Sequence, residues 1–252
     1  MIEIENVSLR LQDTRILHDI SLTLPKGGLT ALVGPNGAGK SSLLSLVARL
    51  QPLQSGRIVV DGLPVDATPG RQLAKRLAIL RQDPAVAARL RVRELVGFGR
   101  FPHGRGRLDD RDRALIEAAL QQFGLQDLAD RFLDTLSGGQ RQRALVAMAF
   151  CQGTDYMLLD EPLNNLDMQF ARQLMRDLRK AVEEERRTVI VVLHDINHAA
   201  VYADRIVAMK AGRVVADGPP SAVLRTEVLA EVFGYPMQVV EIDGAPLVLH
   251  HR

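Results

Sequence analysis

Residues 29–50 read LTALVGPNGAGKSSLLSLVARL. The first five residues form a short continuous apolar run, as expected of a strand that is buried on both faces. A glycine-rich loop follows, and SSLLSLVARL then has the apolar spacing of a helix. The loop GPNGAGKSS (34–42) matches the pattern G-x-x-x-x-G-K-[ST] of phosphate-binding loops, in their usual setting between a strand and a helix. This stretch predicts an α/β fold organised around a phosphate-binding loop, which we call the phosphate loop.

The residue types of the phosphate loop each have a chemical reason. Glycines let the backbone curl so that successive N–H groups point at phosphate oxygens. Lys40 is expected beside the β- and γ-phosphates of a nucleotide, and the Ser41 hydroxyl on its Mg²⁺. The predicted nucleotide-binding residues here are Gly34, Pro35, Asn36, Gly37, Ala38, Gly39, Lys40, Ser41 and Ser42.

Strands and helices alternate along much of the chain. Apolar runs of the same type as 29–33 recur at LAIL (77–80), YMLLD (156–160), TVIVVL (188–193) and RIVAM (205–209). Helical patterns lie between several of them, and in the longest one a single face holds Phe170, Leu174, Leu178, Ala181 and Val182. This alternation predicts a mostly parallel sheet that is covered on both sides.

Two regions depart from that alternation. Spaced apolar residues at Ile2, Ile4, Val7, Leu9 and Leu11 predict an N-terminal antiparallel β subdomain with one buried face. Residues 83–150 have helical patterns but no convincing strand, so we interpret them as a helical insertion subdomain. We predict a single domain over 1–252, with an α/β core at 1–82 and 151–235. A short strand-like tail at 236–252 is expected to leave no room for an additional C-terminal domain.

The composition argues against several classes of protein. The 252 residues have a formal net charge of +2, whereas a nucleic-acid-binding protein is expected to carry a concentrated basic face. The single cysteine, Cys151, lies in the apolar run ALVAMAFC, which fits a buried structural thiol in a reducing compartment. The N-terminus lacks the apolar segment of a secretory signal, and no apolar run approaches the roughly 20 residues of a membrane span. We expect a soluble, cytoplasmic protein that acts at a membrane only through a partner.

Polar side chains follow three of the predicted strands. Asp160 can hold Mg²⁺ through water, and the adjacent Glu161 can polarise the attacking water, which indicates ATP hydrolysis. His194 follows TVIVVL at the sheet edge where ligands bind, so we expect it to donate to the γ-phosphate. His198 has no such placement and is interpreted as structural or exposed. Gln82 follows LAILR, and its neutral amide can reach Mg²⁺ or the attacking water and link the nucleotide to the insertion. The predicted catalytic residues are Glu161 and His194, and the predicted metal ligands are Ser41, Gln82 and Asp160.

A second glycine pair lies in LDTLSGGQRQR (133–143). It precedes the apolar run ALVAMAFC, so we expect it at the first turn of a helix. Free backbone N–H groups and the helix dipole favour an anion at such a turn. One small chain therefore contains two glycine loops that suit phosphate.

Basic residues gather after Gln82. They are Arg89, Arg91, Arg93, Arg100, Arg105 and Arg107. We interpret them as a solvated face with some salt bridges. The alternative is contact with a partner or with anionic lipid headgroups. Nucleic acid is less favoured, because stacking aromatic residues are nearly absent there apart from Phe98 and Phe101.

The ordered set GPNGAGKSS, Gln82, LSGGQ, LLDEP, the LD at 166–167 and His194 resembles the ATPase subunit of an ABC transporter over nearly the whole chain. The resemblance implies a homodimer in which each ATP, with Mg²⁺, lies between the phosphate loop of one copy and the LSGGQ loop of the other. It implies that Ser137, Gly138, Gly139 and Gln140 form the loop that meets the γ-phosphate of the second copy. It also implies that Asp167 belongs to a loop that communicates across the interface.

Further stretches narrow the resemblance. RELVGFGRFPHGRGRL, DEPLNNLDM and VLHDINHAAVYADRIVAMKAGRVVADGPP are similar to the ATPases of importers for ferric siderophores, haem and cobalamin. Within this group, DEPLNNLDM and GRFPHGRGRL are most similar to those of ferric-siderophore importers. The resemblance implies a peripheral subunit on the cytoplasmic face of the inner membrane, docked on permease subunits. A periplasmic or lipid-tethered binding protein would deliver the cargo.

Other functions stay open as alternatives. The nearest are an exporter ATPase and an importer ATPase for haem or cobalamin, since no residue of an ATPase subunit contacts the cargo. A non-transport ABC ATPase acting on DNA or ribosomes is more remote, because the chain has one cysteine, one set of motifs and no long heptad region.

The chain departs from the family pattern at Leu11. The family commonly has an aromatic residue there that stacks on adenine, and stacking contributes about 0.5–1.5 kcal/mol beyond burial. Either adenine selectivity is relaxed or another residue supplies the platform. The phosphate loop also reads KSS where KST is frequent, which we expect to have little consequence because Ser42 keeps a hydroxyl.

Overall fold

The computed structural model describes residues 1–82, 89–104, 106–242 and 244–249. They divide into two compact units, which are considered separately below. The first unit comprises Met1–Thr68 together with Met175–Arg252, and the second comprises Pro69–Leu174.

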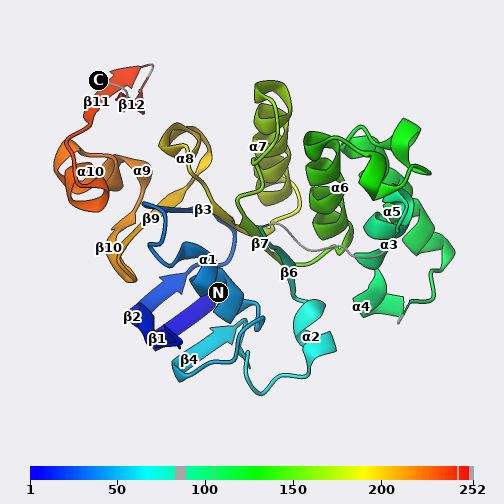
Figure 1. The fold of residues 1–252 in the computed structure, drawn as a ribbon, viewed down its shortest axis with the longest axis horizontal. Helices are drawn as coiled ribbons and strands as arrows, with labels where there is room; N and C mark the ends of the chain where they lie inside the picture. Colours follow the sequence, from blue (N-terminus) through cyan, green and yellow to red (C-terminus); the bar gives the residue numbers. More distant parts are fainter. Residues whose placement is uncertain (83–88, 105, 243, 250–252) are drawn as a thin grey trace. The chain divides into compact units, whose positions relative to one another are not determined.

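The first unit contains two sheets and a C-terminal hairpin (Figure 1). Its strands are β1 (Ile2–Leu11), β2 (Thr14–Leu24), β3 (Gly28–Val33), β4 (Ser55–Val60), β5 (Leu63–Pro64), β8 (Thr188–Val192), β9 (Arg205–Lys210), β10 (Arg213–Gly218), β11 (Gln238–Ile242) and β12 (Ala245–Leu249). Its helices are α1 (Lys40–Val47), α8 (Ile196–Tyr202), α9 (Pro220–Val223) and α10 (Thr226–Phe233).

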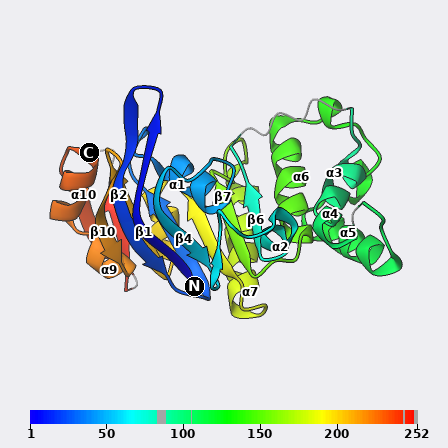
Figure 2. The ribbon, with the colours of Figure 1, turned by 90° about the horizontal axis from the view of Figure 1, so that it is seen from below.

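The N-terminal strands form the predicted antiparallel sheet, in which β1 pairs with both β2 and β4. Ile2, Ile4, Val7 and Leu9 are buried as expected, but Leu11 is 42% exposed. The pairing of β1 with β4 ends at Ser8, whereas the hairpin continues to the pair of Leu11 with Thr14 (dark blue in Figure 2). The expectation that Leu11 shares the buried face is therefore wrong.

Strand β3 lies in the middle of the parallel strands of the first unit. It pairs in parallel with β8 and with β9, and β10 adds to β9 in the antiparallel sense. All of β8 and all of β3 after Gly28 are buried. A strand with both faces covered has no side that needs polar residues, which explains the continuous apolar runs. The predicted α/β class with mostly parallel strands is confirmed.

The C-terminal tail is strand-like, as predicted. β11 and β12 form an antiparallel hairpin. The Asn197 amide exchanges two hydrogen bonds with the backbone of Val248, of 3.1 Å to its carbonyl oxygen and 2.8 Å from its N–H. These bonds attach the hairpin to α8.

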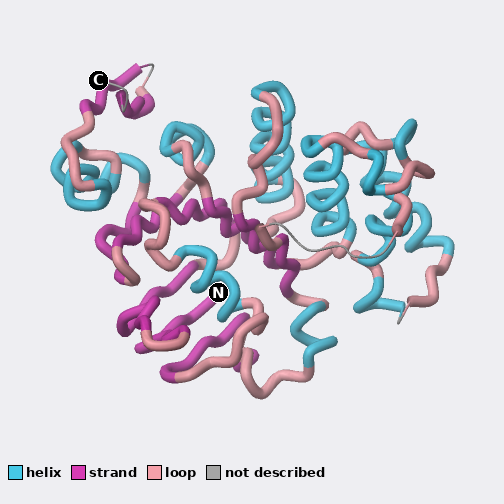
Figure 3. The backbone as a smooth tube through the Cα atoms, in the orientation of Figure 1, coloured by secondary structure: helices cyan, strands magenta, loops and turns pink. Residues whose placement is uncertain are grey.

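The second unit is mostly helical, as Figure 3 shows. Its two strands, β6 (Leu77–Leu80) and β7 (Tyr156–Asp160), are parallel to each other. Its helices are α2 (Gly70–Ala74), α3 (Val92–Phe98), α4 (Phe101–Gly104), α5 (Asp110–Gln122) and α6 (Gly138–Cys151), with short 3-10 turns η1 (Gln126–Leu128) and η2 (Leu133–Thr135). Over the described part of 83–150 there is one isolated bridge, between Arg91 and Phe132, and no strand. The predicted helical insertion is confirmed, while its boundaries stay a prediction.

Helix α7 (Met168–Glu183) begins in the second unit and continues in the first. Leu174, Leu178 and Ala181 are buried, and Phe170 and Val182 are half-buried. The helix face predicted from the apolar spacing is thus the covered face. Among the helices of the described residues, none is long and apolar enough to cross a bilayer.

The helices of the second unit are also held by a buried ion pair. Arg100 is 7% exposed, and its Nε donates to Asp112 Oδ1 at 2.8 Å. Its Nη1 donates to the carbonyl oxygens of Cys151 and Gln152, at 2.9 and 3.1 Å, so Arg100 closes the C-terminal end of α6. The prediction that Arg100 belongs to a solvated arginine face is wrong, because these acceptors lie inside the helical unit.

Candidate nucleotide-binding and catalytic site

The phosphate loop leaves β3 and enters α1. Gly34, Gly37 and Gly39 have φ values of 140°, 77° and 97°, a region that residues with a side chain rarely adopt. A Cβ on Gly34 would lie 2.0 Å from the carbonyl oxygen of Met209. The loop therefore needs glycine for the curl of its own backbone and for its close approach to β9.

Lys40 is the first residue of α1, and its side chain reaches back to the start of the phosphate loop. Its side chain is buried, and its Nζ donates to the carbonyl oxygens of Gly34 at 2.8 Å and Pro35 at 3.0 Å. Among the described residues, no side chain caps α1 and none in its first turn is acidic. The N-terminal N–H groups of α1 and the ammonium of Lys40 thus give this loop the positive character that a phosphate needs.

Strand β2 and the turn between β9 and β10 pack against the phosphate loop. A Cβ on Gly39 would lie 2.6 Å from Leu17 Cδ2, and Gly212 N donates to the carbonyl oxygen of Ala38 at 3.1 Å. Strand β2 and the β9–β10 turn therefore fix the second half of the loop. Leu11 lies farther along the hairpin, and its place in the adenine site stays a prediction.

His194 follows β8 in the same unit. Leu193 N donates to the carbonyl oxygen of Leu32 at 3.2 Å, so the chain still follows β3 one residue before the histidine. His194 is exposed, and it lies at the strand end from which the phosphate loop starts. Its contact with the γ-phosphate stays a prediction. His198 is half-buried in α8, with Nδ1 3.5 Å from a carboxylate oxygen of Asp195.

In the second unit, β7 ends in the two predicted carboxylates. Asp160 is 6% exposed and Glu161 is 9% exposed. The backbone of Glu161 has a φ of 52°, in the left-handed region. Such a conformation costs about 1–3 kcal/mol in a residue other than glycine, and it persists only where the surroundings fix it.

Two amides converge on the Glu161 carboxylate. Its Oε2 accepts hydrogen bonds from Gln82 Nε2 at 2.7 Å and from Asn164 Nδ2 at 2.6 Å. The structure thus brings together two residues that the sequence predicts, Gln82 and Glu161. Asn164 was not predicted, and the only signal for it was the pair of asparagines in LNNLD after the acid.

The predicted Mg²⁺ ligands have suitable chemistry. Mg²⁺ prefers oxygen ligands, keeps several waters and is usually bound by one or two carboxylates together with nucleotide phosphates. Ser41, Gln82 and Asp160 offer a hydroxyl, an amide and one carboxylate, and Gln82 directs its N–H rather than its carbonyl oxygen at Glu161. No cluster of three His, Cys, Asp or Glu side chains within the described ranges could hold a metal.

The LSGGQ loop begins α6, as predicted. Ser137 is the N-cap: its Oγ accepts from Gln140 N at 3.3 Å, and its own N–H donates to Gln140 Oε1 at 3.0 Å. This capping box satisfies two donors that were expected to be free. We call residues Ser137–Gln140 the signature loop.

The signature loop is packed against the residues that follow Glu161. A Cβ on Gly139 would lie 2.9 Å from the carbonyl oxygen of Asn165, whereas one on Gly138 would make an ordinary contact of 3.5 Å with Asn165 Cβ. Asp167 caps the start of α7, with Oδ1 accepting from Phe170 N at 2.9 Å. The backbone thus requires Gly139, while Gly138 is exposed and has space for a side chain.

The other arginines after Gln82 have varied surroundings. Arg89 and Arg91 lie over the Phe132 ring, at 4.2 and 5.3 Å from its centroid. Arg93 is paired with Glu117, and Arg107 is exposed. Arg105 lies outside the described residues. The solvated-face interpretation therefore holds for only part of the group.

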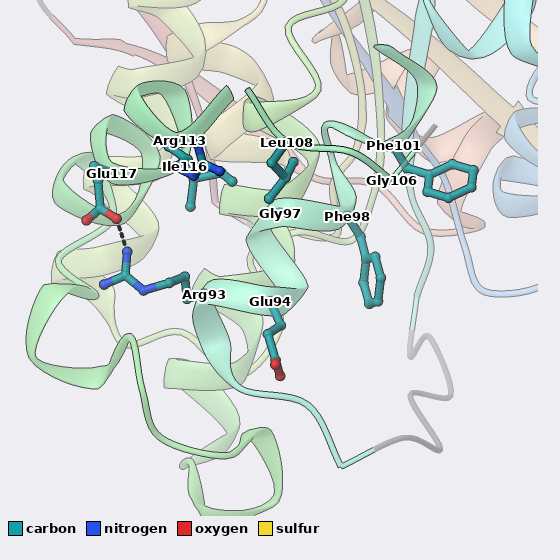
Figure 4. A pocket seen from close by; sticks show the side chains of 10 residues that line it. All are labelled: Arg93, Glu94, Gly97, Phe98, Phe101, Gly106, Leu108, Arg113, Ile116 and Glu117. Carbon is teal, nitrogen blue, oxygen red and sulfur yellow. Dashed lines mark ion pairs between the residues drawn. The ribbon is translucent and has the colours of Figure 1, made fainter. Parts of the chain in front are cut away.

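A cavity of about 480 Å³ opens between α3, α4 and α5 (Figure 4). Phe98, Phe101, Leu108 and Ile116 are among the residues that line it. Phe98 and Phe101 are 50% and 58% exposed. Large apolar side chains this exposed are typical of a surface that binds another molecule. We call this surface the aromatic pocket.

Cys151 is buried at the end of α6 and is not part of the site. Burial raises the pKa of its thiol to about 11. The thiol is therefore protonated at neutral pH, as expected for the predicted structural cysteine.

A phosphate loop at the carboxyl end of a central strand, with a carboxylate pair ending another strand, defines a P-loop nucleotide hydrolase. Residues 17–164 match the family described as "ABC transporter", and the chain belongs to this family. The predicted ABC ATPase class is confirmed.

Relatives and solved structures extend this result. The petrobactin import ATP-binding protein YclP of Bacillus subtilis is 46% identical over 244 residues, covering 97% of each chain. The iron(3+)-hydroxamate import ATP-binding protein FhuC of the same organism is 39% identical over 94% of this chain and 88% of its own. A dimeric post-hydrolysis state of the ATP-binding cassette MJ0796, bound to ADP and Pi, covers 87% of this chain and 99% of its own, with a TM-score of 0.77 and 27% identity.

Proposed function

We propose that this chain is the ATP-binding and ATP-hydrolysing subunit that powers import of an iron–siderophore complex through a membrane permease. The observation that carries the proposal is the presence of two unlike glycine loops in one chain. The phosphate loop has an uncapped helix start and a buried lysine, whereas the signature loop is capped by its own serine. The names of the two relatives supply the class of cargo.

Each subunit first binds ATP by its own phosphate loop. Backbone N–H groups of residues 34–42 and the Lys40 ammonium hold the phosphates, and Ser41, Gln82 and Asp160 are the residues that would hold Mg²⁺. Glu161 then takes a proton from the attacking water, whose oxygen bonds to the γ-phosphorus as the bond to the β-phosphate oxygen breaks and ADP leaves. His194 donates a hydrogen bond to the γ-phosphate as negative charge develops. A bound Mg²⁺ would neutralise part of the phosphate charge.

Hydrolysis requires a second copy of the chain. The signature loop has no nucleotide of its own and contacts the γ-phosphate that the second copy binds, through Ser137, Gly138, Gly139 and Gln140. Asp167 lies in the loop that communicates between the two sites. A group supplied in trans of this kind is comparable with an arginine finger, which contributes about 10³–10⁵ in rate. The dimer of MJ0796 with ADP and Pi supports this arrangement.

Two variants test the catalytic part of the proposal. Glu161→Gln is expected to bind ATP, to form a stable dimer and to hydrolyse ATP poorly. Ser137→Ala is expected to leave ATP binding by the monomer intact and to abolish the protein-concentration-dependent part of hydrolysis. Normal turnover by Glu161→Gln would remove Glu161 from this role, and loss of ATP binding by Ser137→Ala monomers would mean that both loops serve one site.

The cargo is tested in cells. A strain whose only copy carries Lys40→Ala is expected to grow poorly under iron limitation with a ferric siderophore as the iron source. Unimpaired use of every siderophore would contradict the iron assignment. A defect confined to haem or cobalamin use would support those alternatives, and tight, salt-sensitive binding to DNA or ribosomes would support a non-transport ATPase.

The partner is a pair of permease subunits, which place the protein on the cytoplasmic face of the membrane. A periplasmic or lipid-tethered binding protein would deliver the cargo to them. We propose that a cytoplasmic helix of the permease inserts apolar side chains between Phe98 and Phe101 in the aromatic pocket. The exposed Arg107, next to the lining residue Leu108, favours acidic groups beside those apolar ones.

The docking site is tested with a matched pair of variants. The double substitution Phe98→Ser with Phe101→Ser is expected to keep ATP hydrolysis by the isolated subunit and to lose co-purification with the permease. Leu115→Ser is the control, because Leu115 is 38% exposed in α5 and does not line the pocket. Normal assembly of the double variant would contradict this docking site without affecting the assignment of ATP hydrolysis.

A further inference from the structure

We infer that Asn164 is a positioning residue for hydrolysis, which holds the carboxylate of Glu161 in the orientation needed to take a proton from water. The inference rests on the proposed role of Glu161 as the general base. Nothing in the motif pattern assigns Asn164 a role. The contact that assigns it is the hydrogen bond of 2.6 Å from Asn164 Nδ2 to Glu161 Oε2.

Asn164 belongs to the same turn as the residue it holds. Its backbone N–H donates to the carbonyl oxygen of Glu161 at 3.2 Å, so the two residues are joined through both main chain and side chain. Glu161 is in the left-handed region, with a φ of 52°. The backbone sets the direction in which its side chain leaves, and the Asn164 amide fixes where the carboxylate ends.

The second amide on Glu161 has a different origin. Gln82 comes from the end of β6, 79 positions away in the chain, and donates to the same Oε2 at 2.7 Å. In the proposed ATP-bound state Gln82 would also bind Mg²⁺, so its position would depend on the nucleotide. Asn164 moves with Glu161, since it lies three residues away in one turn. Asn164 is therefore the constant partner of the carboxylate, and Gln82 is the one that changes with nucleotide state.

The choice of an amide fits this role. Its N–H group orients the carboxylate without bringing in a charge that would compete for Mg²⁺ or for the phosphates. Aspartate at position 164 would have the same shape but no N–H, and it would place a second negative charge beside the Glu161 oxygen. A substitution to aspartate thus reverses the interaction while nearly conserving the volume.

The turn has a separate support that allows a comparison. Gln142 Nε2, on α6, donates to the carbonyl oxygen of Pro162 at 3.0 Å. This bond holds the backbone of the turn and does not reach the carboxylate. If Asn164 only stabilised the turn, its removal and the removal of the Gln142 amide would have similar effects.

The experiment measures ATP hydrolysis by purified Asn164→Ala, Asn164→Asp and Gln142→Ala, each alone and in the Glu161→Gln background. Asn164→Ala is expected to lower kcat by about 10–100-fold while KM for ATP stays within about twofold, since displacing a catalytic group by about 1 Å costs about 10²-fold. Asn164→Asp is expected to lose more, and Gln142→Ala to change kcat by less than about threefold. In the Glu161→Gln background, Asn164→Ala is expected to cause no further loss.

Three outcomes would overturn the inference. They are a normal kcat for Asn164→Ala, an undiminished loss in the Glu161→Gln background, and an equal loss for Gln142→Ala. Melting curves of every variant establish that the compared proteins are folded. If Glu161→Gln itself turned over normally, the proposed role of Glu161 would fail. If it were inactive while Asn164→Ala stayed active, only the present inference would fail.

Discussion

The two glycine loops look alike in sequence and differ in their construction. In the phosphate loop the glycines adopt positive φ values and Lys40 is buried over its own backbone. In the signature loop Gly138 and Gly139 are part of the helix, and Ser137 caps it. The first loop has a curled backbone that suits a phosphate, whereas the second is a capped helix N-terminus with an exposed serine.

This difference supports the proposal that the two loops have different roles. A helix N-terminus attracts anions because its first N–H groups lack partners. Among the residues that the structure describes, no side chain caps α1, whereas the reciprocal bonds of Ser137 and Gln140 satisfy two donors at the start of α6. Without a second copy, the signature loop is therefore the weaker anion site. In the proposed dimer, its contribution to hydrolysis would depend on the position of the Ser137 hydroxyl.

The largest expected effect is the difference between two glycine-to-alanine substitutions, one in each loop. Gly34→Ala would place Cβ 2.0 Å from the Met209 carbonyl oxygen at a φ of 140°, so we expect the first unit to fail to fold or to lose ATP binding entirely. Gly138→Ala adds a Cβ at an ordinary distance of 3.5 Å in a helical turn, so we expect it to fold and bind ATP. Expression, thermal melting and nucleotide titration of the two variants check this contrast.

Equal behaviour of the two alanine variants would break the comparison. If Gly34→Ala folded and bound ATP normally, the phosphate loop would have the freedom that we ascribe to the signature loop. If Gly138→Ala failed to fold, the signature loop would be as constrained as the phosphate loop.

The next effect concerns the far end of α6, which has a pH-dependent anchor. The Arg100 guanidinium, hydrogen-bonded to Asp112, holds the pKa of that carboxyl below its usual value of 3.8. A carboxyl with a lowered folded pKa contributes stability above its unfolded pKa and loses it as the pH falls through the folded pKa. We expect Asp112→Asn to lose about 3–5 kcal/mol of unfolding free energy at pH 7, because Arg100 stays buried without its counter-ion. We expect this deficit to shrink below about pH 4.

Urea unfolding of wild type and Asp112→Asn between pH 3 and pH 7 measures this deficit. Asp110→Asn is the control, because Asp110 is fully exposed and its ion pair with Arg113 lies at the surface. A deficit that is constant from pH 3 to pH 7 would show that Asp112 contributes through packing rather than charge.

Much of this fold could be predicted because apolar runs and glycine patterns depend on the local backbone conformation and on local burial. The stretch from β3 through the phosphate loop to α1 could be predicted, because an apolar run followed by that loop pattern is compatible with few other structures. The failures at Leu11 and Arg100 have a common cause. In both cases, contacts with residues far away in the sequence decide whether the side chain is buried. The pairing of β1 with β4 ends before Leu11, whereas α5 and α6 enclose Arg100. Asn164 was missed because its partner depends on the left-handed turn at Glu161, which no spacing rule reports.

The smallest effect separates the two roles of Ser137. Aspartate is as good an N-cap as serine, whereas alanine removes the cap and costs about 1 kcal/mol. We expect Ser137→Asp to keep the unfolding free energy of wild type and Ser137→Ala to lose about 1 kcal/mol, as measured by urea unfolding. Ser137→Asp is nevertheless expected to abolish dimer-dependent ATP hydrolysis, since it brings a carboxylate to the γ-phosphate. A Ser137→Asp variant that hydrolysed ATP normally would mean that the serine acts only as a cap, and the signature loop would then be no more than the start of a helix.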